Sequence, residues 1–230
     1  MKKVVLVTIA FCFVLTSIYG QSKIDNGLWG TISLEKQFTK KFSFQVDEEV
    51  RFKDNVSRLD LLYSNLGFSY SFLKGFKSGI YYRLIEKYTN DNDYKFKHRF
   101  MFELSYKYRI SSISFSYRSR VQTNIKDLNS YCSTKYAWYW RNKFEVKYSF
   151  KRFSPYLGAE FYYLISNPWK EDIDNGWYKW KPFIGFDYKI NSRNEFGAYY
   201  LLKRGIDVDD SNDVNVIGLR YKYTLPYEKQ

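Results

Sequence analysis

Residues 42–52 read FSFQVDEEVRF, and this stretch decides the fold. Successive side chains of a β-strand point to opposite faces, so one face of this segment is apolar, with Phe42, Phe44, Val46, Val50 and Phe52. The other face is polar, with Ser43, Gln45, Asp47, Glu49 and Arg51. A period of two predicts a strand that separates an apolar environment from a polar one.

The same alternation recurs along the chain, and no stretch keeps a helical period of 3.6. We count eleven such segments, starting near residues 28, 42, 60, 76, 94, 112, 137, 155, 178, 194 and 213. Bacterial single-chain barrels have even numbers of strands. The sequence therefore predicts either ten strands or twelve, and residues 123–136 are where a twelfth would lie.

The apolar faces could pack into a soluble sandwich or face lipid. The segments run for about 11 to 14 residues, longer than typical soluble strands and matching a tilted membrane strand. Their ends carry aromatic rings, among them Tyr106, Tyr108, Trp138, Trp140 and Tyr221, as the girdles of membrane barrels do. We predict an antiparallel transmembrane β-barrel of about 10–12 strands, with a soluble sandwich as the alternative.

The connections between segments alternate in length. Residues 39–41, 73–75, 109–111, 151–153 and 191–193 form short basic turns. The connections at 53–58, 89–93, 123–136, 166–176 and 205–212 are longer, and three of them are acidic. Short turns of outer-membrane barrels face the periplasm and long loops face outward, which predicts the orientation.

Composition supports export. Residues 1–20 combine a basic start, a short apolar stretch and a terminal Gly20, as in a cleaved signal peptide, which leaves residues 21–230 as one barrel domain. Cys132 is then the only cysteine, so no internal disulfide is expected.

The mature chain is basic: removing the signal leaves 35 basic against 24 acidic residues. We place this charge on turns and in the lumen, and we expect no nucleic-acid partner.

Several short motifs resemble one family. They are residues 26–30 (NGLWG), 48–52 (EEVRF), 99–103 (RFMFE) and 155–161 (PYLGAEF). Together with the signal peptide they resemble the uncharacterised outer-membrane barrels grouped as domain-of-unknown-function family 2490. The resemblance implies a barrel in contact with outer-membrane lipid and brings no established activity. Residues 218–223 (GLRYKY) also resemble the C-terminal signal that the barrel-assembly machinery reads.

The predicted lumen holds the candidate site. Its inward arginines include Arg51, Arg83, Arg99, Arg118, Arg120 and Arg141, and its candidate ion-pair partners are Glu49, Glu103, Glu145 and Glu160. Arginine forks bind carboxylate or phosphate, so these residues predict either an internal ion-pair network or a site for a small anionic solute. We expect Arg99 and Arg141 to be paired, because their strands also carry Glu103 and Glu145. Arg118 and Arg120 share a strand without an acid in phase, so we expect them to be the functional pair.

No catalytic motif, phosphate loop or metal-ligand spacing occurs in the sequence, so we expect no enzyme activity and no cofactor. The only histidine, His98, falls in phase with Phe96 and Phe100 on the apolar face. Three hypotheses follow. The protein is a narrow pore or anion-binding vestibule, a sealed structural barrel acting through acidic outer loops, or, least favoured, a lipid-modifying enzyme centred on His98.

Overall fold

The computed structural model describes residues 25–88, 94–126, 136–168, 175–206 and 213–227. The predicted signal peptide, Cys132 and the acidic residues expected in the longer loops lie outside these ranges. Within them, no helix is long and apolar enough to cross a membrane.

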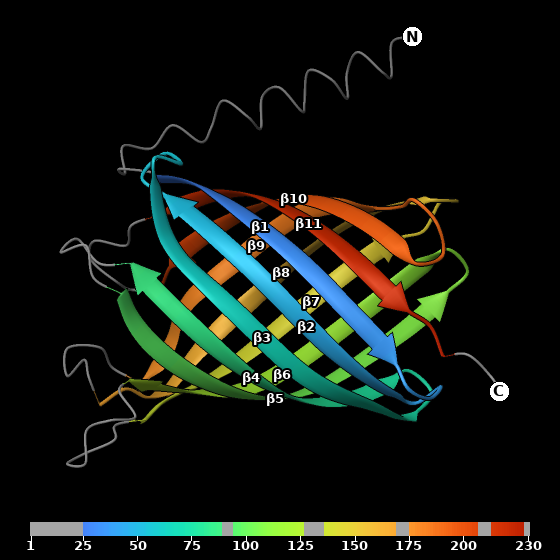
Figure 1. Cartoon of the computed structure of the whole chain (residues 1–230), viewed down its shortest axis with the longest axis horizontal. Coiled ribbons are helices and arrows are strands. Elements are labelled where there is room, and N and C mark those ends of the chain that lie inside the picture. The colour runs from blue at the N-terminus through green and yellow to red at the C-terminus, as the bar shows by residue number, and fades with distance from the viewer. Residues whose placement is uncertain (1–24, 89–93, 127–135, 169–174, 207–212, 228–230) are drawn as a thin grey trace, which may run out of the picture.

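The described residues form an all-β closed barrel (Figure 1). Its eleven strands are β1 (Asp25–Gln37), β2 (Phe42–Lys53), β3 (Arg58–Leu73), β4 (Phe76–Tyr88), β5 (Tyr94–Ile110), β6 (Ile113–Lys126), β7 (Tyr136–Tyr148), β8 (Phe153–Ser166), β9 (Gly176–Lys189), β10 (Asn194–Gly205) and β11 (Val214–Leu225). Each begins within three residues of its predicted start, because the period-2 pattern is a local property of the sequence. The closed barrel rules out the sandwich architecture.

The barrel closes between its first and last strands. β1 and β11 pair in parallel, from Asp25 opposite Val214 to Lys36 opposite Leu225, while every other neighbouring pair is antiparallel. The expectation of exactly ten or twelve strands is therefore wrong for the described residues, although eleven lies within the predicted range. An odd number of strands can close only with one parallel pair, and here that pair is as long as its antiparallel neighbours.

The predicted division of faces is confirmed. On β5 the outward side chain of Phe102 is 54% exposed, whereas its inward neighbours Met101 and Glu103 are 3% and 9% exposed. On β4 the outward Ile80 is 66% exposed. The polar face of each strand therefore lines the lumen, and the apolar face forms the outer wall.

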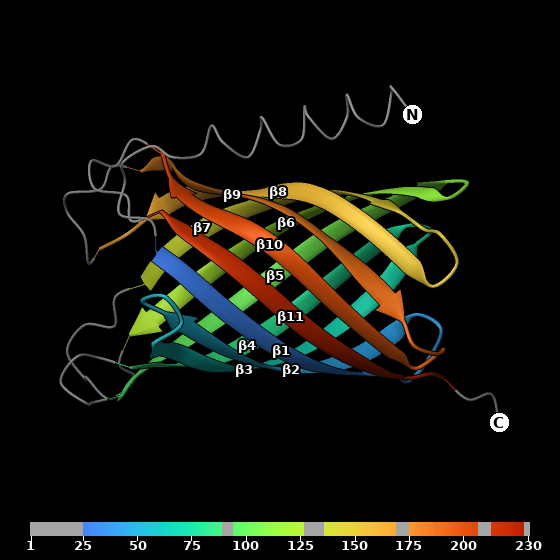
Figure 2. The same ribbon diagram turned by 90° about the horizontal axis from the view of Figure 1, so that it is seen from above.

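The two ends of the barrel differ as predicted. The hairpins at 38–41, 74–75, 111–112, 149–152 and 190–193 gather at one end, which we call the turn end (Figure 1). The strand ends that the longer connections join lie at the other end, which we call the loop end; the view turned by 90° shows the same separation of the strand ends (Figure 2). The two-residue hairpin between β3 and β4 turns through Gly75 at a φ of +83°, a backbone conformation that favours glycine.

Large inward rings lie flat against the wall where glycine leaves room. A Cβ atom on Gly67 would lie 1.9 Å from the ring of Tyr81, and one on Gly218 would lie 2.0 Å from the ring of Tyr199. These glycines let the two rings lie along the sheet. The centre of the lumen is thereby left open.

Candidate functional site in the barrel lumen

The lumen contains a cavity of about 1310 Å³ that reaches the loop end. Its lining extends from Asp25, Asp54 and Arg58 at the loop end to Tyr156 and Arg220 deeper in the barrel. A smaller cavity of about 440 Å³ lies toward the turn end. Arg118 and Lys143 line both cavities and so lie where the two meet.

The lining of the large cavity is strongly basic and rich in tyrosine. Among the described residues it holds fourteen Lys and Arg side chains against seven Asp and Glu. All six predicted arginines line it, as do Glu49, Glu103 and Glu160. Its seven tyrosines are Tyr63, Tyr81, Tyr139, Tyr156, Tyr162, Tyr178 and Tyr199. This surplus of cationic side chains makes the electrostatic potential of the cavity positive.

Three of the arginines form one cluster with two carboxylates, which we call the Glu103–Glu160 cluster. Arg120 pairs with Glu103, the residue directly opposite it on β5. Arg118 lies 2.6 Å from Glu160 and 3.9 Å from Glu103. Arg141 donates two hydrogen bonds of 2.8 Å from one terminal nitrogen to the two carboxylate oxygens of Glu160. The cluster joins β5, β6, β7 and β8 through buried or half-buried groups.

This cluster shows that Arg118 and Arg120 have acidic partners, contrary to the premise on which they were predicted to be the functional pair. Neither has an acid in phase on its own strand, yet both are paired, because Glu103 and Glu160 reach them from β5 and β8. Arg141 is paired as expected, although its partner is Glu160 instead of an acid on its own strand. The three arginines therefore act first as partners of buried carboxylates.

Glu145 is an ion-pair partner of lysines. Its carboxylate lies 2.9 Å from Lys143 and 3.9 Å from Lys147, both on its own strand. Lys147 also pairs with Asp187, which is 2% exposed and in turn pairs with Arg220. These ion pairs link β7, β9 and β11 toward the turn end, and of their members only Lys143 and Arg220 line the large cavity.

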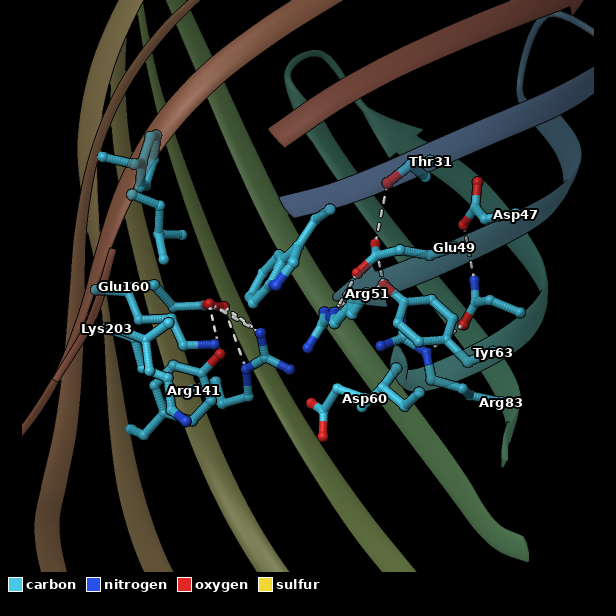
Figure 3. A pocket seen from close by; sticks show the side chains of 18 of the residues that line it. Thr31, Asp47, Glu49, Arg51, Asp60, Tyr63, Arg83, Arg141, Glu160 and Lys203 are labelled. Carbon is cyan, nitrogen blue, oxygen red and sulfur yellow. Dashed lines mark hydrogen bonds and ion pairs between the residues drawn. The ribbon is translucent and has the colours of Figure 1, made fainter. Parts of the chain in front are cut away.

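A second buried group surrounds Glu49. Its carboxylate accepts hydrogen bonds from Thr31, at 3.1 Å, and from Arg51 and Tyr63. The guanidinium carbon of Arg51 stands 3.6 Å from the centre of the Trp29 ring, a cation–π arrangement. Arg51 is thus paired and held in place. Figure 3 shows this group on one side of the cavity and Arg141 with Glu160 on the other.

Arg83 and Arg99 have different surroundings. They lie directly opposite each other on β4 and β5, and neither is within ion-pair distance of a carboxylate among the described residues. The Nε of Arg99 donates to Asn124 at 2.6 Å, and the Nε of Arg83 donates to Asn65 at 3.4 Å. The expectation that Arg99 is paired with an acid is wrong, because Glu103 pairs with Arg120 of β6 instead.

Sequence reasoning overlooked Lys181 of β9, which lines the cavity. Its ammonium lies 4.7 Å from the centre of the Tyr162 ring and 5.5 Å from that of Trp29. The inward phase of Lys179 and Lys181 in residues 178–190 would have identified it.

His98 lies on the outer wall, as its phase predicts. Its Nδ1 is 2.7 Å from the hydroxyl of Tyr82 on the neighbouring strand. Ser114 and Ser116 belong to the inward face of β6. In the part of the chain that the structure describes, no group of three or more His, Cys, Asp or Glu residues could hold a metal ion.

The fold and the lumen define an all-β barrel with a basic, tyrosine-rich cavity inside an apolar outer wall. The chain belongs to the family described as "Protein of unknown function (DUF2490)", which matches residues 26–215. No curated protein matches it. Among solved structures it is similar to the β domain of the Bordetella autotransporter BrkA, with a TM-score of 0.47 and 10% identity over 80% of this chain and 84% of that one.

Proposed function

We propose that the protein is an outer-membrane β-barrel whose lumen is an outward-facing vestibule for small anions. The observation that carries the proposal is the charge of the large cavity, whose described lining holds fourteen bases against seven acids and which reaches the end with the long connections. In outer-membrane barrels that end faces outward. Anions arriving from outside would meet this positive field first.

The outer wall supports a membrane location. Large apolar side chains such as Ile32, Ile80, Leu157 and Ile184 are 59% to 66% exposed on strands around the barrel. In lipid every backbone polar group needs an internal partner, and a closed barrel provides one. Leu219 and Tyr221 also lie on the exposed face of β11, where the assembly machinery would meet them.

A vestibule fits the lumen better than an open pore does. Lys107, Lys147, Asp187 and Lys222, toward the turn end, are absent from the lining of the large cavity. Ion pairs occupy that region, including Lys222 with Glu35 at 2.5 Å. An ion crossing the barrel would have to separate these charges or pass between them.

A sealed structural barrel is the second candidate, and the Glu103–Glu160 cluster favours it. Three of the six arginines predicted to bind anions are already paired there. In this alternative the remaining surplus charge only attracts counter-ions. The lipid-modifying enzyme remains the least favoured hypothesis, and unchanged lipid hydrolysis and transfer in His98→Ala would remove it.

Two measurements on the refolded protein separate these alternatives. We expect little conductance in planar bilayers and saturable binding of inorganic phosphate in detergent. Ohmic openings with anion preference would indicate a pore. If the protein showed neither conductance nor phosphate binding, the result would favour the sealed barrel and would contradict the vestibule.

A further inference from the structure

We propose that Arg83 and Arg99 form the anchor for the phosphate group of a water-soluble phosphorylated compound. This inference rests on the proposed vestibule and names its ligand class. It starts from the register of β4 and β5, which places the two arginines directly opposite each other on the inward face. Like charges at such positions repel and destabilise the sheet unless something neutralises them.

The surrounding side chains orient the two guanidiniums without neutralising them. Asn65 and Asn124 each accept a hydrogen bond from an Nε nitrogen, through neutral amide oxygens. Asn65 donates in turn to Asp47 at 2.9 Å, so the nearest carboxylate on this path is already bonded to the amide. Arg83 also stands 3.8 Å above the ring of Tyr63. Figure 3 shows Arg83 beside Tyr63.

The terminal nitrogens of both arginines remain available. Among the residues that the structure describes, these four nitrogens have no hydrogen-bond partner, and both side chains line the large cavity. Each guanidinium is held through its Nε atom. Its terminal N–H groups can therefore donate hydrogen bonds to the oxygen atoms of a ligand. The other arginine groups differ, because Glu49, Glu103 and Glu160 already take their donors.

The charge selects the ligand group. Two uncompensated positive charges match a doubly negative group, and a phosphate monoester carries a charge of about −1.5 to −2 at neutral pH. A carboxylate carries only one. Phosphate also offers three acceptor oxygens, enough to accept hydrogen bonds from both guanidiniums at once.

The shape of the site indicates how the ligand enters and what it carries. All eleven neighbouring strand pairs are formed, so the described wall offers no lateral opening from the membrane, whereas the cavity reaches the loop end. A lipid headgroup would have to enter through the wall, so the ligand comes from water. The volume of about 1310 Å³ far exceeds that of bare phosphate. The aromatic rings and hydroxyls of Tyr139 and Tyr178, which also line the cavity, suit a sugar ring.

Calorimetric titration of the refolded full-length barrel in detergent tests the proposal. The probes are glucose 6-phosphate, inorganic phosphate, acetate, glucose and dispersed phosphatidic acid. The variants are Arg83→Gln, Arg99→Gln and the control Arg109→Gln. Arg109 is on the same strand as Arg99 and lines neither cavity. We expect the wild type to bind both soluble phosphates more tightly than acetate or glucose.

Arg83→Gln and Arg99→Gln should each weaken glucose 6-phosphate binding by about tenfold to a hundredfold, because each removes charge-assisted hydrogen bonds. Neither should lower the unfolding temperature, since neither leaves a carboxylate unpaired. The Arg109→Gln variant should bind glucose 6-phosphate as tightly as the wild type does. Wild-type phosphate affinity in both cavity variants would overturn the anchor while leaving the vestibule intact. Binding of phosphatidic acid alone would overturn the water-soluble ligand, and no anion binding at all would overturn the vestibule itself.

Discussion

The guanidinium of Arg120 forms an ion pair with the carboxylate of Glu103, the residue directly opposite it on the neighbouring strand. Both side chains are buried, at 8% and 9% exposure. Arg118 approaches the same carboxylate at 3.9 Å and binds Glu160 more closely. One acid on β5 thus helps to hold two arginines of β6 in place, so the pair is central to the packing of the lumen.

Glu103→Gln should therefore destabilise the barrel. The substitution leaves Arg120 charged and buried without its partner, and breaking a buried pair costs about 3–5 kcal/mol. We expect the lower end of that range, because the adjoining cavity admits water. Urea unfolding of the refolded barrel, followed by tryptophan fluorescence, measures the loss.

The matched control is the double variant Glu103→Gln with Arg120→Met, which removes both charges and keeps the volume. It should recover most of the lost stability. A double variant no more stable than the single one would show that the charge of Arg120 is not the source of the loss.

The sequence predicts the faces of these strands but not their partners. The side-chain period is two, so the phase of Arg118, Arg120 and Glu103 follows from each segment alone. Which strand lies opposite, and at which register, depends on the turns and on closure of the whole barrel. Glu160 reaches Arg118 from two strands away, a contact that no local pattern encodes.

The strand count shows the same limit. Each of the eleven strands was recognisable from its alternation, but the general rule of even numbers favoured ten or twelve. Only the parallel register of β1 and β11 reconciles the eleven segments with a closed barrel. Lys181 was overlooked for a different reason, since Pro182, two glycines and a bulge weaken the alternation of β9.

The assignment of faces can be tested on β5. Phe102→Arg places a charge on the outer wall and should hinder assembly, because such a charge costs about 2–4 kcal/mol near the bilayer midplane. Ser105→Arg, at an inward position beside the smaller cavity, should be much milder. The fraction of folded protein on unboiled gels measures both. Equal damage from the two variants would contradict the assignment.

The location can be tested on the native protein. It should fractionate with outer membranes, migrate faster on gels unboiled than boiled, and give a β-type circular dichroism spectrum in detergent. The physical reason is that its exposed apolar wall and fully paired strands suit lipid. Release of the protein in soluble form from the periplasm would defeat this prediction.

The parallel pairing of β1 with β11 gives the most specific prediction about the fold. Ile32 and Tyr221 lie opposite each other across β1 and β11. Neighbouring strands lie about 4.8 Å apart, within the spacing that a disulfide can bridge. Ile32→Cys with Tyr221→Cys, in a Cys132→Ser background, should therefore cross-link on oxidation, as a mobility shift that a reductant reverses. Ile32→Cys with Leu225→Cys should not, because Leu225 lies four residues further along, opposite Lys36. In a ten-strand barrel β11 would instead close against β2, so a failure of the first pair to cross-link would point to that closure.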